Sequence, residues 1–326
     1  MNVVTGATGH IGNTLIRELI AKGEKVRAVT PPREDTSPLE GLKVDLVEGD
    51  VRNIDSLMRA FEGCDIVYHL AGIISIVPGK GNLMHQVNVG GARNVVEVCL
   101  STGVERLIYT SSIHAIAEPP HGTIIDETLP FDPDRTIGNY GRSKALAAGE
   151  VLKGIGKGLN AVIVCPTGVT GPHDYKVSEM GQLIMDFFER KLKAYVVGSY
   201  DFVDVRDVAR GHILAGQKGE AGQTYILSGE RITVVELLST IEEIAGVKAP
   251  SWKMPRRLAR AAGVLASPYY WLAKARPLFT AYSIDVLASN SLVSSEKARR
   301  ELGYSSRPVK ESIQAAIEWF KEAGMV

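Results

Sequence analysis

The sequence predicts an α/β protein with a doubly wound parallel sheet and a smaller, mostly C-terminal α/β region. Three observations predict this class. Short apolar runs rich in β-branched residues alternate with amphipathic stretches of about ten to fifteen residues. Most of these runs are apolar throughout, as in parallel strands that helices cover on both faces. The first run leads directly into a glycine-rich turn, TGATGHIG, which a helical pattern follows.

The first half of the chain contains six expected strands, because β-branched residues are concentrated in six short runs. These are MNVVTG at 1–6, KVRAVT at 25–30, KVDLVEGD at 43–50, CDIVYHLAG at 64–72, RLIYTSS at 106–112 and LNAVIVCPT at 159–167. Four helices are expected because apolar residues recur three and four positions apart. They are NTLIRELIAKG at 13–23, IDSLMRAFEG at 54–63, ARNVVEVCLSTG at 92–103 and RSKALAAGEVLKGIG at 142–156.

The second half continues the alternation less regularly. A helix is expected at 181–191, a strand at 193–198, and a strand followed by a helix at 201–217. The strand-helix pattern returns at TYILSG (224–229) and ITVVELLSTIEEIAG (232–246), and IQAAIEWFKEAG (313–324) closes the chain as an amphipathic helix.

Residues 250–280 form a proline-broken, arginine-rich apolar stretch that begins PSWKMPRRLARAAGV. One interpretation is a helix that lies at a membrane surface. The other is a set of helices packed on the smaller region. The prolines favour the second interpretation because they interrupt any long amphipathic face.

The composition is that of an ordinary globular protein, and it argues against several partner classes. The chain has 326 residues, of which 45% are hydrophobic, and its 37 Lys and Arg residues balance 37 Asp and Glu residues. No nucleic-acid partner is expected, because no global basic field exists. The cysteines at 64, 99 and 165 form no CxxC pair, which argues for a reducing compartment.

Targeting and membrane signals are also absent from the sequence patterns. The N-terminal MNVVTGATGHIG lacks the basic and apolar regions of a signal peptide. No stretch reaches the roughly 18 uncharged apolar residues of a membrane span. We therefore expect a cytoplasmic protein with no membrane insertion.

The turn TGATGHIG, residues 5–12, predicts a phosphate-binding site. Between a strand and a helix, Gly6 permits the tight turn, Gly9 lets the backbone approach a pyrophosphate, and Gly12 allows close packing of the helix. The free N–H groups of the helix N-terminus then face the anion. We expect residues 1–168 to form a dinucleotide-binding Rossmann domain. Residues 169–326 are expected to be mainly substrate-binding, with about 195–226 returning to the Rossmann sheet.

The choice between NAD and NADP depends on the residues after the second strand. An acid at the end of that strand binds the ribose of NAD, whereas an arginine nearby binds the 2′-phosphate of NADP. The strand ends at Thr30 without an acid, and Glu34 and Asp35 come a few residues later. Arg33 favours NADP, with a solvated loop charge as the alternative. Asp50, after the third strand, is expected either to accept from the adenine amino group or to cap the next helix.

The pair Tyr140 and Lys144, in NYGRSK, suggests proton transfer. Residues four apart share one face of a helix, so the ammonium can lie beside the phenol. A nearby positive charge lowers the pKa of a tyrosine and makes it a usable acid and base. Alone, such a pair is more often an ordinary surface pair.

The whole set of motifs is more specific than any one of them. With TGATGHIG, GDVRN, HLAG, YTSS and YGRSK in this order, the chain resembles the extended short-chain dehydrogenase/reductases, the NAD-dependent epimerase/dehydratase superfamily, over essentially its whole length. FVDVRDVARGH and SSEKARRELGY look like two segments of its substrate-binding half. Within it, the chain is most similar to the dihydroflavonol-reductase-like group, which includes hopanoid-associated sugar epimerases. The resemblance also suggests a homodimer formed through a bundle that includes the Tyr140 helix.

The resemblance implies roles for individual residues. Ser112 would hydrogen-bond the substrate oxygen with help from Ser111, Tyr140 would be the acid/base, and Lys144 would bind the nicotinamide ribose and depress the tyrosine pKa. A matching asparagine, Asn88, has a plain helix-start residue as its alternative. The expected cofactor-binding residues are Gly6, Thr8, Gly9, His10, Ile11, Gly12, Arg33, Asp50, Val51, Leu70, Ala71, Gly72, Asn88, Tyr140, Lys144, Pro166, Thr167 and Val169. The expected substrate residues are His114, Tyr175 and Arg206. No metal is expected, because the histidines show no ligand spacing.

Two departures from the family bear on the substrate. Members that act on nucleotide-sugars commonly carry an arginine where this chain has Val164 and Cys165, and another where it has Tyr200. A diphosphate would lose two positive partners, although Arg206 or Arg256 could replace them. Arg33 is also displaced by two positions from the arginine of the reductases, because Pro31 stands there.

Three functions are compatible with these residues. The first is an NAD(P)-dependent oxidoreductase that interconverts a carbonyl and an alcohol with a releasable cofactor, NADP or NAD. The second is an NAD-dependent sugar or nucleotide-sugar epimerase or dehydratase, which oxidises its substrate transiently with a retained cofactor. The third is a redox-sensing binding protein, which the intact Tyr140 and Lys144 pair disfavours. The expected partner is a small carbonyl, alcohol or sugar.

Overall fold

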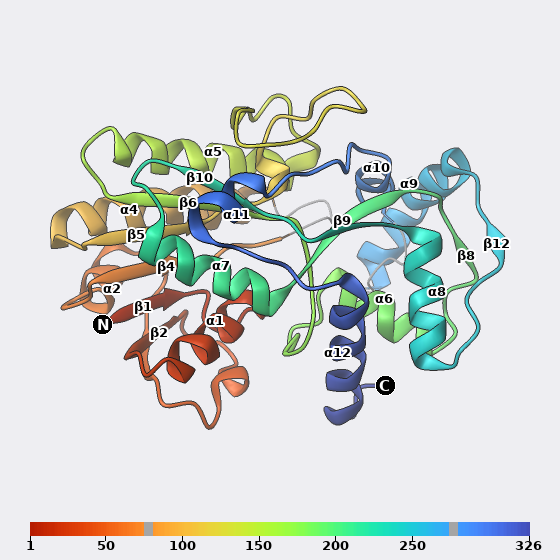
Figure 1. Cartoon of the computed structure of the whole chain (residues 1–326), viewed down its shortest axis with the longest axis horizontal. Helices are drawn as coiled ribbons and strands as arrows, with labels where there is room; N and C mark the ends of the chain where they lie inside the picture. The colour runs from red at the N-terminus through yellow and green to blue at the C-terminus, as the bar shows by residue number, and fades with distance from the viewer. Residues whose placement is uncertain (75–80, 274–279) are drawn as a thin grey trace.

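A seven-stranded sheet, parallel throughout, forms the centre of the larger part of the molecule (Figure 1). The computed structural model describes residues 1–74, 81–273 and 280–326. In spatial order the strands are β10 (Thr224–Leu227), β6 (Ala161–Pro166), β5 (Arg106–Thr110), β4 (Ile66–His69), β1 (Asn2–Thr5), β2 (Val26–Thr30) and β3 (Asp45–Glu48). The order reverses between β1 and β4, where open parallel sheets bind ligands.

Helices cover both faces of this sheet. One face packs against α1 (His10–Ala21), α7 (Val205–Lys218) and α11 (Glu296–Leu302), and the other against α2 (Ile54–Ala60), α4 (Gly91–Thr102) and α5 (Gly138–Ile155). Consecutive strand residues alternate between the two cores: Leu107 lies in one and Ile108 in the other. Both side chains are fully buried. The predicted doubly wound sheet is confirmed, and its strands are apolar throughout because each face has its own core.

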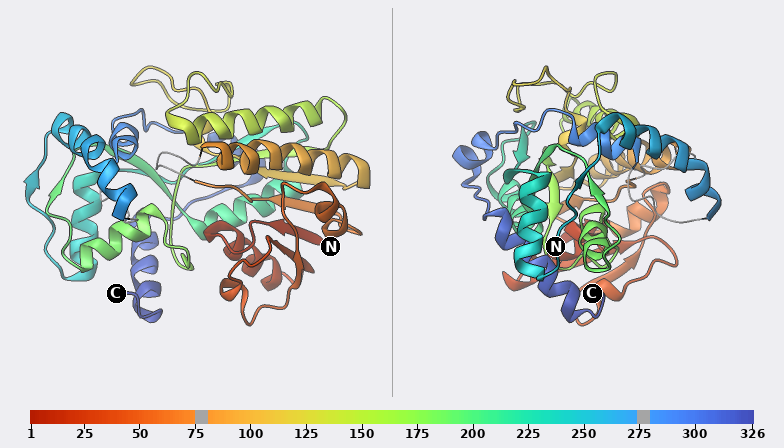
Figure 2. Two further views of the ribbon diagram at one scale, coloured as in Figure 1. Left: turned by 180° about the vertical axis from the view of Figure 1, so that it is seen from behind. Right: turned by 90° about the vertical axis from the view of Figure 1, so that its right-hand side faces the viewer.

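The smaller region lies at one end of the molecule, and Figure 2 shows the same two-part arrangement from behind. Its strands are β7 (Gly168–Thr170), β9 (Ser199–Asp204) and β11 (Glu230–Thr233) in one sheet, and β8 (Ala194–Tyr195) and β12 (Trp252–Lys253) in another. Its helices are α6 (Glu179–Phe188), α8 (Val234–Ala245), α9 (Arg256–Ala273), α10 (Ala281–Leu287) and α12 (Val309–Glu322). The remaining helical turns are η1 (Ser37–Leu39), α3 (Gly81–Met84), η2 (His85–Gly90) and η3 (Ile113–Ala115).

Residues of about 195–226 were expected to return to the large sheet, but they divide between the large sheet and the smaller region. Strand β10 pairs with β6, and α7 packs on α1. Strand β9 instead pairs with β7 and β11 in the three-stranded sheet. The chain therefore crosses between the two parts inside one strand-helix unit, β9 to α7.

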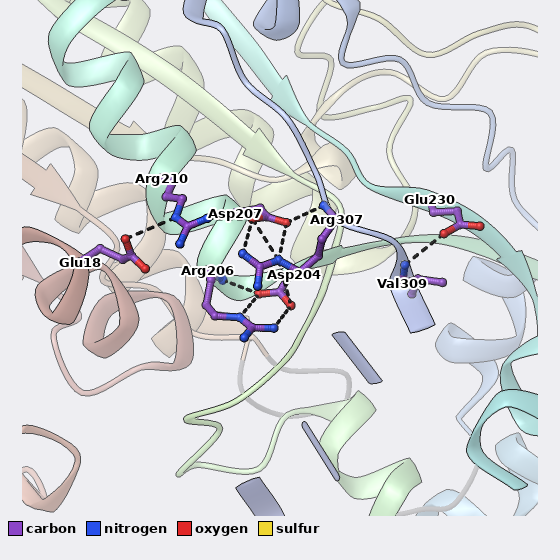
Figure 3. A network of polar contacts seen from close by, with 8 residues as sticks. All are labelled: Glu18, Asp204, Arg206, Asp207, Arg210, Glu230, Arg307 and Val309. Atoms are coloured by element: carbon purple, nitrogen blue, oxygen red, sulfur yellow. Dashed lines mark hydrogen bonds and ion pairs between the residues drawn. The ribbon is translucent and has the colours of Figure 1, made fainter. Parts of the chain in front are cut away.

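A buried ionic network fixes this crossing (Figure 3). Asp204 caps α7 by accepting from the backbone N–H of Arg206 at 2.8 Å. Arg307, just before α12, donates to Asp207 through Nη2 at 2.8 Å and lies 3.7 Å from Asp204. Both carboxylates are almost fully buried. Arg307 thus connects the C-terminal helix to the start of α7.

Helix α9 lies within residues 250–280, for which the sequence allowed either a helix at a membrane surface or helices packed on the smaller region. Its Ala259 is buried in a small cluster with Val196 and Ile284, so the expected packing of helices on the smaller region is confirmed for this inner face. Leu258 and Val264 on the same helix are exposed. Among the described helices, none is long and apolar enough to cross a membrane.

Candidate active site

The glycine-rich turn joins β1 to α1 at the point where the strand order reverses. Gly6 has a left-handed φ of 69°, and a Cβ there would lie 2.7 Å from the backbone nitrogen of Ala71. A Cβ on Gly12 would lie 2.1 Å from the carbonyl oxygen of Gly6. Gly9 precedes α1 without a side-chain cap, so the first N–H groups of the helix are left for a ligand. These residues form a cradle that fits the pyrophosphate of a dinucleotide.

A carboxylate also lies against this turn. The hydroxyl of Thr8 donates to Glu34 at 3.0 Å, and the ammonium of Lys176 donates to Thr8 at 2.9 Å and binds Glu34 as well. Glu34 was noted in the sequence a few residues after the second strand but was given no role, and Lys176 was not identified. The signal for Glu34 was an acid within a few residues of the strand end, whereas nothing local pointed to Lys176.

Arg33 behaves differently from its neighbour Glu34. Its backbone has a left-handed φ of 63° and its side chain is exposed. Within the described part of the chain, it makes no ion pair. Its role as a ligand of a 2′-phosphate remains a prediction.

The loop at 171–177 covers the N-terminal half of α1. His10 shares a 2.9 Å hydrogen bond with the carbonyl oxygen of Pro172, and Asn13 donates to the carbonyl oxygen of His173 at 3.1 Å. The Tyr175 hydroxyl accepts from Arg17 at 3.2 Å, and its ring lies 5.0 Å from that of Trp319. Tyr175 thus faces α1 and α12, and its expected contact with substrate is not supported because these elements already bind it.

Asp50 does not cap the helix that follows the third strand, and its expected contact with adenine remains a prediction. Its carboxylate binds the guanidinium and the backbone N–H of Arg52, the latter at 2.9 Å. The cap of α2 is Asn53, which accepts from the backbone of Ser56. The capping alternative is therefore wrong, because a better-placed residue follows three positions later. Val51, next to Asp50, is buried against Gly91.

Asn88 joins the turn after β4 to the helix that carries Tyr140. Its Oδ1 accepts from the N–H of Ile73 at 2.8 Å, and its Nδ2 donates to the carbonyl of Ile73 and to the hydroxyl of Ser143, both at 3.0 Å. It lies inside the π-helical turn η2, so it is not a helix-start residue. A Cβ on Gly72 would lie 3.3 Å from Asn88 and 4.0 Å from the Lys144 ammonium. Asn88 thus fixes HLAG close to Lys144.

Ser112 and Tyr140 come together as predicted from the motifs that carry them. Ser112 follows β5 and Tyr140 lies in the first turn of α5. Burial raises the pKa of Tyr140 to about 12, and a hydrogen bond with the Ser112 hydroxyl opposes this rise. Ser111 is buried, and its side chain lies against Tyr109 and Cys165. Of the two serines, Ser112 is therefore the one that contacts Tyr140.

Lys144 lies one turn further along α5, on the same face. Its Nζ donates to the carbonyl oxygen of Thr110 at 2.5 Å and lies 4.8 Å from the centre of the Tyr109 ring. Burial lowers the pKa of Lys144 to about 8. The expected depression of the tyrosine pKa by Lys144 is wrong for this structure, in which the pKa of Tyr140 is raised. Burial outweighs the hydrogen bond, and Lys144 is itself poorly solvated and directed to a carbonyl.

Neutral aromatic side chains surround the Tyr140 phenol. His114 shares a 2.7 Å hydrogen bond with the hydroxyl of Tyr200, and its ring centre lies 6.3 Å from those of Tyr140 and Tyr282. Burial lowers the pKa of His114 to about 4, so its imidazole is neutral at pH 7. Burial also raises the pKa of Tyr200 and Tyr282. Tyr282 was not anticipated, because no motif surrounds it.

A small cavity opens beside these rings, with a free volume of about 20 Å³, or room for about one water molecule. Its lining is mainly aliphatic and hydroxylic, and its charged side chains are the carboxylates Glu118 and Asp201. The lining residues are Ile113, His114, Ile116, Glu118, Ile125, Ile137, Thr167, Tyr200, Asp201, Ser289, Asn290, Ser291 and Val293. No arginine or lysine of the described residues lines it.

Arg206, the third expected substrate residue, lies elsewhere. Its guanidinium binds the carboxylate of Asp204 through Nε at 2.9 Å and Nη2 at 2.7 Å (Figure 3). The expectation that Arg206 contacts substrate is not supported, because its charge is neutralised at the start of α7.

The segment after β6 reaches the same cavity. Thr167 donates to Asp201 at 2.6 Å, and Asp201 also accepts from the backbone of Gly229 at 2.9 Å. Burial raises the pKa of Asp201. Pro166 ends β6 and Val169 lies in β7, on either side of Thr167. This segment therefore connects the large sheet to the cavity wall.

Comparison with known proteins gives consistent results. The model of the "NAD dependent epimerase/dehydratase family" matches residues 2–228. Sterol demethylase protein B of Methylococcus capsulatus is 36% identical over 99% of both chains. The 3beta-hydroxysteroid-dehydrogenase/decarboxylase isoform 1 of Arabidopsis thaliana is 31% identical over 98% of this chain and 79% of that protein. The crystal structure of gox2253 superposes with a TM-score of 0.88 and 35% identity, covering 100% and 99% of the two chains.

Proposed function

The chain belongs to the NAD-dependent epimerase/dehydratase family and is an enzyme of it, and we propose that its reaction is net hydride transfer between nicotinamide C4 and a carbonyl or alcohol carbon. Family membership makes it an NAD(P)-dependent oxidoreductase or epimerase with a nicotinamide cofactor. The choice of net redox rests on the surroundings of Tyr140.

The chemistry is assigned to three side chains. A bound nicotinamide would supply or accept the hydride. Tyr140 gives a proton to the substrate oxygen in reduction and takes it back in oxidation, while Ser112 donates a second hydrogen bond to that oxygen where negative charge develops. Lys144, whose pKa burial lowers to about 8, binds the nicotinamide ribose and can pass a proton toward the phenol.

The observation that carries the proposal is the neutral lining beside Tyr140. The cavity has aliphatic walls and two carboxylates, and no described lysine or arginine lines it. A diphosphate would find no positive partner there and would meet Glu118 and Asp201. Since the cavity has room for about one water molecule, a substrate would enter only as these side chains move apart, and the isoleucine and aromatic side chains would then give a lipophilic ketone or alcohol an apolar surface.

The names of two relatives support the same substrate class. The proteins at 36% and 31% identity are named for a sterol and a hydroxysteroid. We therefore propose a lipophilic, polycyclic secondary alcohol or the matching ketone as substrate. Such a molecule needs few polar contacts beyond those that hold its reacting oxygen.

The proposed dinucleotide is NAD, contrary to the expectation based on Arg33. The Glu34 carboxylate beside Thr8 could accept from both ribose hydroxyls, and it would repel a 2′-phosphate. Lys176 and Arg33 are the cations that would oppose this preference. Coenzyme binding to Glu34 and Arg33 variants tests the point.

The reaction is tested with purified protein, both reduced coenzymes and two substrate panels. With lipophilic ketones, such as keto-steroids, we expect net oxidation of NADH followed by its absorbance. With UDP-sugars we expect neither coenzyme consumption nor isomerisation. Interconversion of UDP-sugars by protein that retains NAD through desalting would overturn the proposal.

One observation favours the epimerase or dehydratase as the second candidate. The loop at 171–177 is tied to the glycine-rich turn and α1 by Lys176, His10 and Asn13. A covered phosphate site slows cofactor release, which an enzyme with transient oxidation requires. Measured dissociation of NAD on the timescale of one turnover would count against this candidate.

Two further properties remain proposals. We propose a homodimer formed through α4 and α5, which expose the hydrophobic Leu100 and Leu152. Sedimentation velocity, with Leu152→Glu as the variant, tests it, since a charge in such an interface should yield monomer. We also propose a cytoplasmic location, which cell fractionation tests.

A further inference from the structure

A stretch rich in cations lies at the end of the molecule away from the large sheet. Figure 1 shows β8, β12, α8 and α9 together there. Residues 246–264 contain five Lys and Arg residues and no Asp or Glu, although the whole chain has 37 of each sign. We define the basic end by its exposed cations Arg190, Lys193, Lys248, Lys253, Arg256 and Arg257. Within the described residues, none of these six is in an ion pair.

Three of these cations border an open hollow. It is lined by Phe187, Arg190, Leu192, Lys193, Gly246, Lys248 and Pro250, and its free volume is about 420 Å³. None of the described residues that line it carries a carboxylate. The hollow joins the rest of the basic end through strand pairing, because Ala194, next to Lys193, pairs with Trp252.

Large apolar side chains are exposed on the same end. Trp252 is 58% exposed, Leu258 61% and Val264 52%. Ala259 and Gly263 are buried on the inner face of α9, four residues apart. The outer face of the helix therefore presents Leu258 and Val264 together with Arg257.

The basic end also adjoins the cavity. Helix α9 packs on α10, which carries Tyr282. The ring of Tyr282 lies 6.3 Å from that of His114, and Ser289, Asn290 and Ser291 after α10 line the cavity. Helix α10 therefore contacts α9 and also carries a side chain close to the proposed substrate site.

We propose that the basic end binds the surface of an anionic lipid bilayer, with Trp252 and Leu258 at headgroup depth. Unpaired cations beside exposed apolar residues on one helix face are the features that such a surface recognises. Lipid phosphates are the chemistry that fits a hollow with three cations and no carboxylate. The proposed contact is peripheral, and none of the described helices would cross the bilayer. It would bring a lipophilic substrate of the proposed function to the cavity, but binding itself does not depend on the reaction.

The test is co-sedimentation of the full chain with phosphatidylcholine vesicles, with and without phosphatidylglycerol. We expect binding only with phosphatidylglycerol, weakened by added salt. Each cation contributes about 1 kcal/mol, or about 5-fold in partition, so Arg256→Gln with Arg257→Gln should weaken binding by about 25-fold. Trp252→Ser should weaken it as well, through lost apolar contact.

Matched controls separate the basic end from net charge. Lys22→Gln with Lys25→Gln removes the same charge from an exposed site at the other part of the molecule and should leave vesicle binding within about 2-fold of the parent. Equal losses in both double variants, or equal binding to vesicles without phosphatidylglycerol, would overturn the proposal. The proposal would also be overturned if the parent were a dimer and the variant with both Arg256→Gln and Arg257→Gln were a monomer. A second copy of the chain would then cover this face in place of a lipid surface. Coenzyme binding, measured in parallel, reports on folding and on the proposed function separately.

Discussion

The ammonium of Lys144 donates a 2.5 Å hydrogen bond to the carbonyl oxygen of Thr110, at the end of the strand that leads into Ser112. This contact holds the lysine against the main chain behind Tyr140. Burial leaves its pKa near 8 and raises that of the phenol to about 12. The two groups of the proposed proton transfer are thus held in fixed positions by the folded chain.

Removal of the Tyr140 hydroxyl should abolish most turnover. We expect Tyr140→Phe to lower kcat at least about 100-fold, the usual loss of a general acid, with coenzyme affinity nearly unchanged. Tyr282→Phe is the matched control, because its ring lies by the same histidine, and it should stay within a few-fold of the parent. Turnover of Tyr140→Phe close to the parent would remove Tyr140 from the mechanism.

Coenzyme preference should respond to Glu34. In Glu34→Gln the carboxylate no longer repels a 2′-phosphate, so the ratio of affinities should shift toward NADP by about 10-fold, the equivalent of about 1.4 kcal/mol. Arg33→Ser should shift it the opposite way. Titration of both coenzymes by isothermal calorimetry measures the ratio, and an unchanged ratio in both variants would exclude this loop from discrimination.

The contribution of Lys144 to stability should rise with pH above about 8. Its pKa is lowered in the folded state, so the unfolded chain binds more protons between about pH 8 and the ordinary lysine value near 10.4. Lys144 by itself should then contribute an increase of up to about 3 kcal/mol in the free energy of unfolding across that window, while buried Cys99, Cys165 and Tyr140, whose pKa values burial raises, contribute in the opposite direction. Lys144→Met should lack this increase, which urea unfolding at several pH values can detect. A parallel pH profile in the parent and the variant would contradict the assigned pKa.

Buried neutral histidines should make the protein sensitive to acid. Burial lowers the pKa of His114 and of His212 to about 4, below the ordinary 6.5. Between these values the unfolded state takes up protons that the folded state does not, so stability falls as the pH drops from 6.5 to 4. Each group contributes about 1.4 kcal/mol per pH unit. Thermal unfolding of His114→Gln should show a shallower pH dependence than the parent.

Arg307 should be worth more to stability than other surface arginines. Arg307→Ala leaves Asp204 and Asp207 buried without their shared cation, so we expect a loss of about 3 kcal/mol. Arg260→Ala, which breaks an exposed pair with Asp285 outside this network, should cost less than about 1 kcal/mol. Chemical denaturation of the two variants compares them directly. Equal losses would mean that the network in Figure 3 is not what joins α12 to α7.

The fold could be predicted largely because its signals are local. The runs that become β1, β6 and the helix α5 show their apolar periodicity within a few residues. The second half was harder. KAYVVG became only the two-residue strand β8, and β9 left the large sheet for β7 and β11, because pairing partners are chosen by packing rather than by propensity.

In the candidate site, too, some features follow from the local sequence and others from tertiary packing. Sequence by itself determined the glycine-rich turn, whose close contacts admit no Cβ at Gly6 or Gly12, and the i, i+4 spacing that places Tyr140 and Lys144 on one helix face. Both are short-range constraints of backbone geometry.

Only the tertiary structure decided what surrounds them. It brought Lys176 to Thr8 across 168 residues and Tyr200 to His114 across 86. It directed Arg206 to Asp204, and it gave Tyr140 and Lys144 their shifted pKa values. Proximity between distant residues and the loss of water around a charge arise only when the chain packs, so no local pattern could encode them.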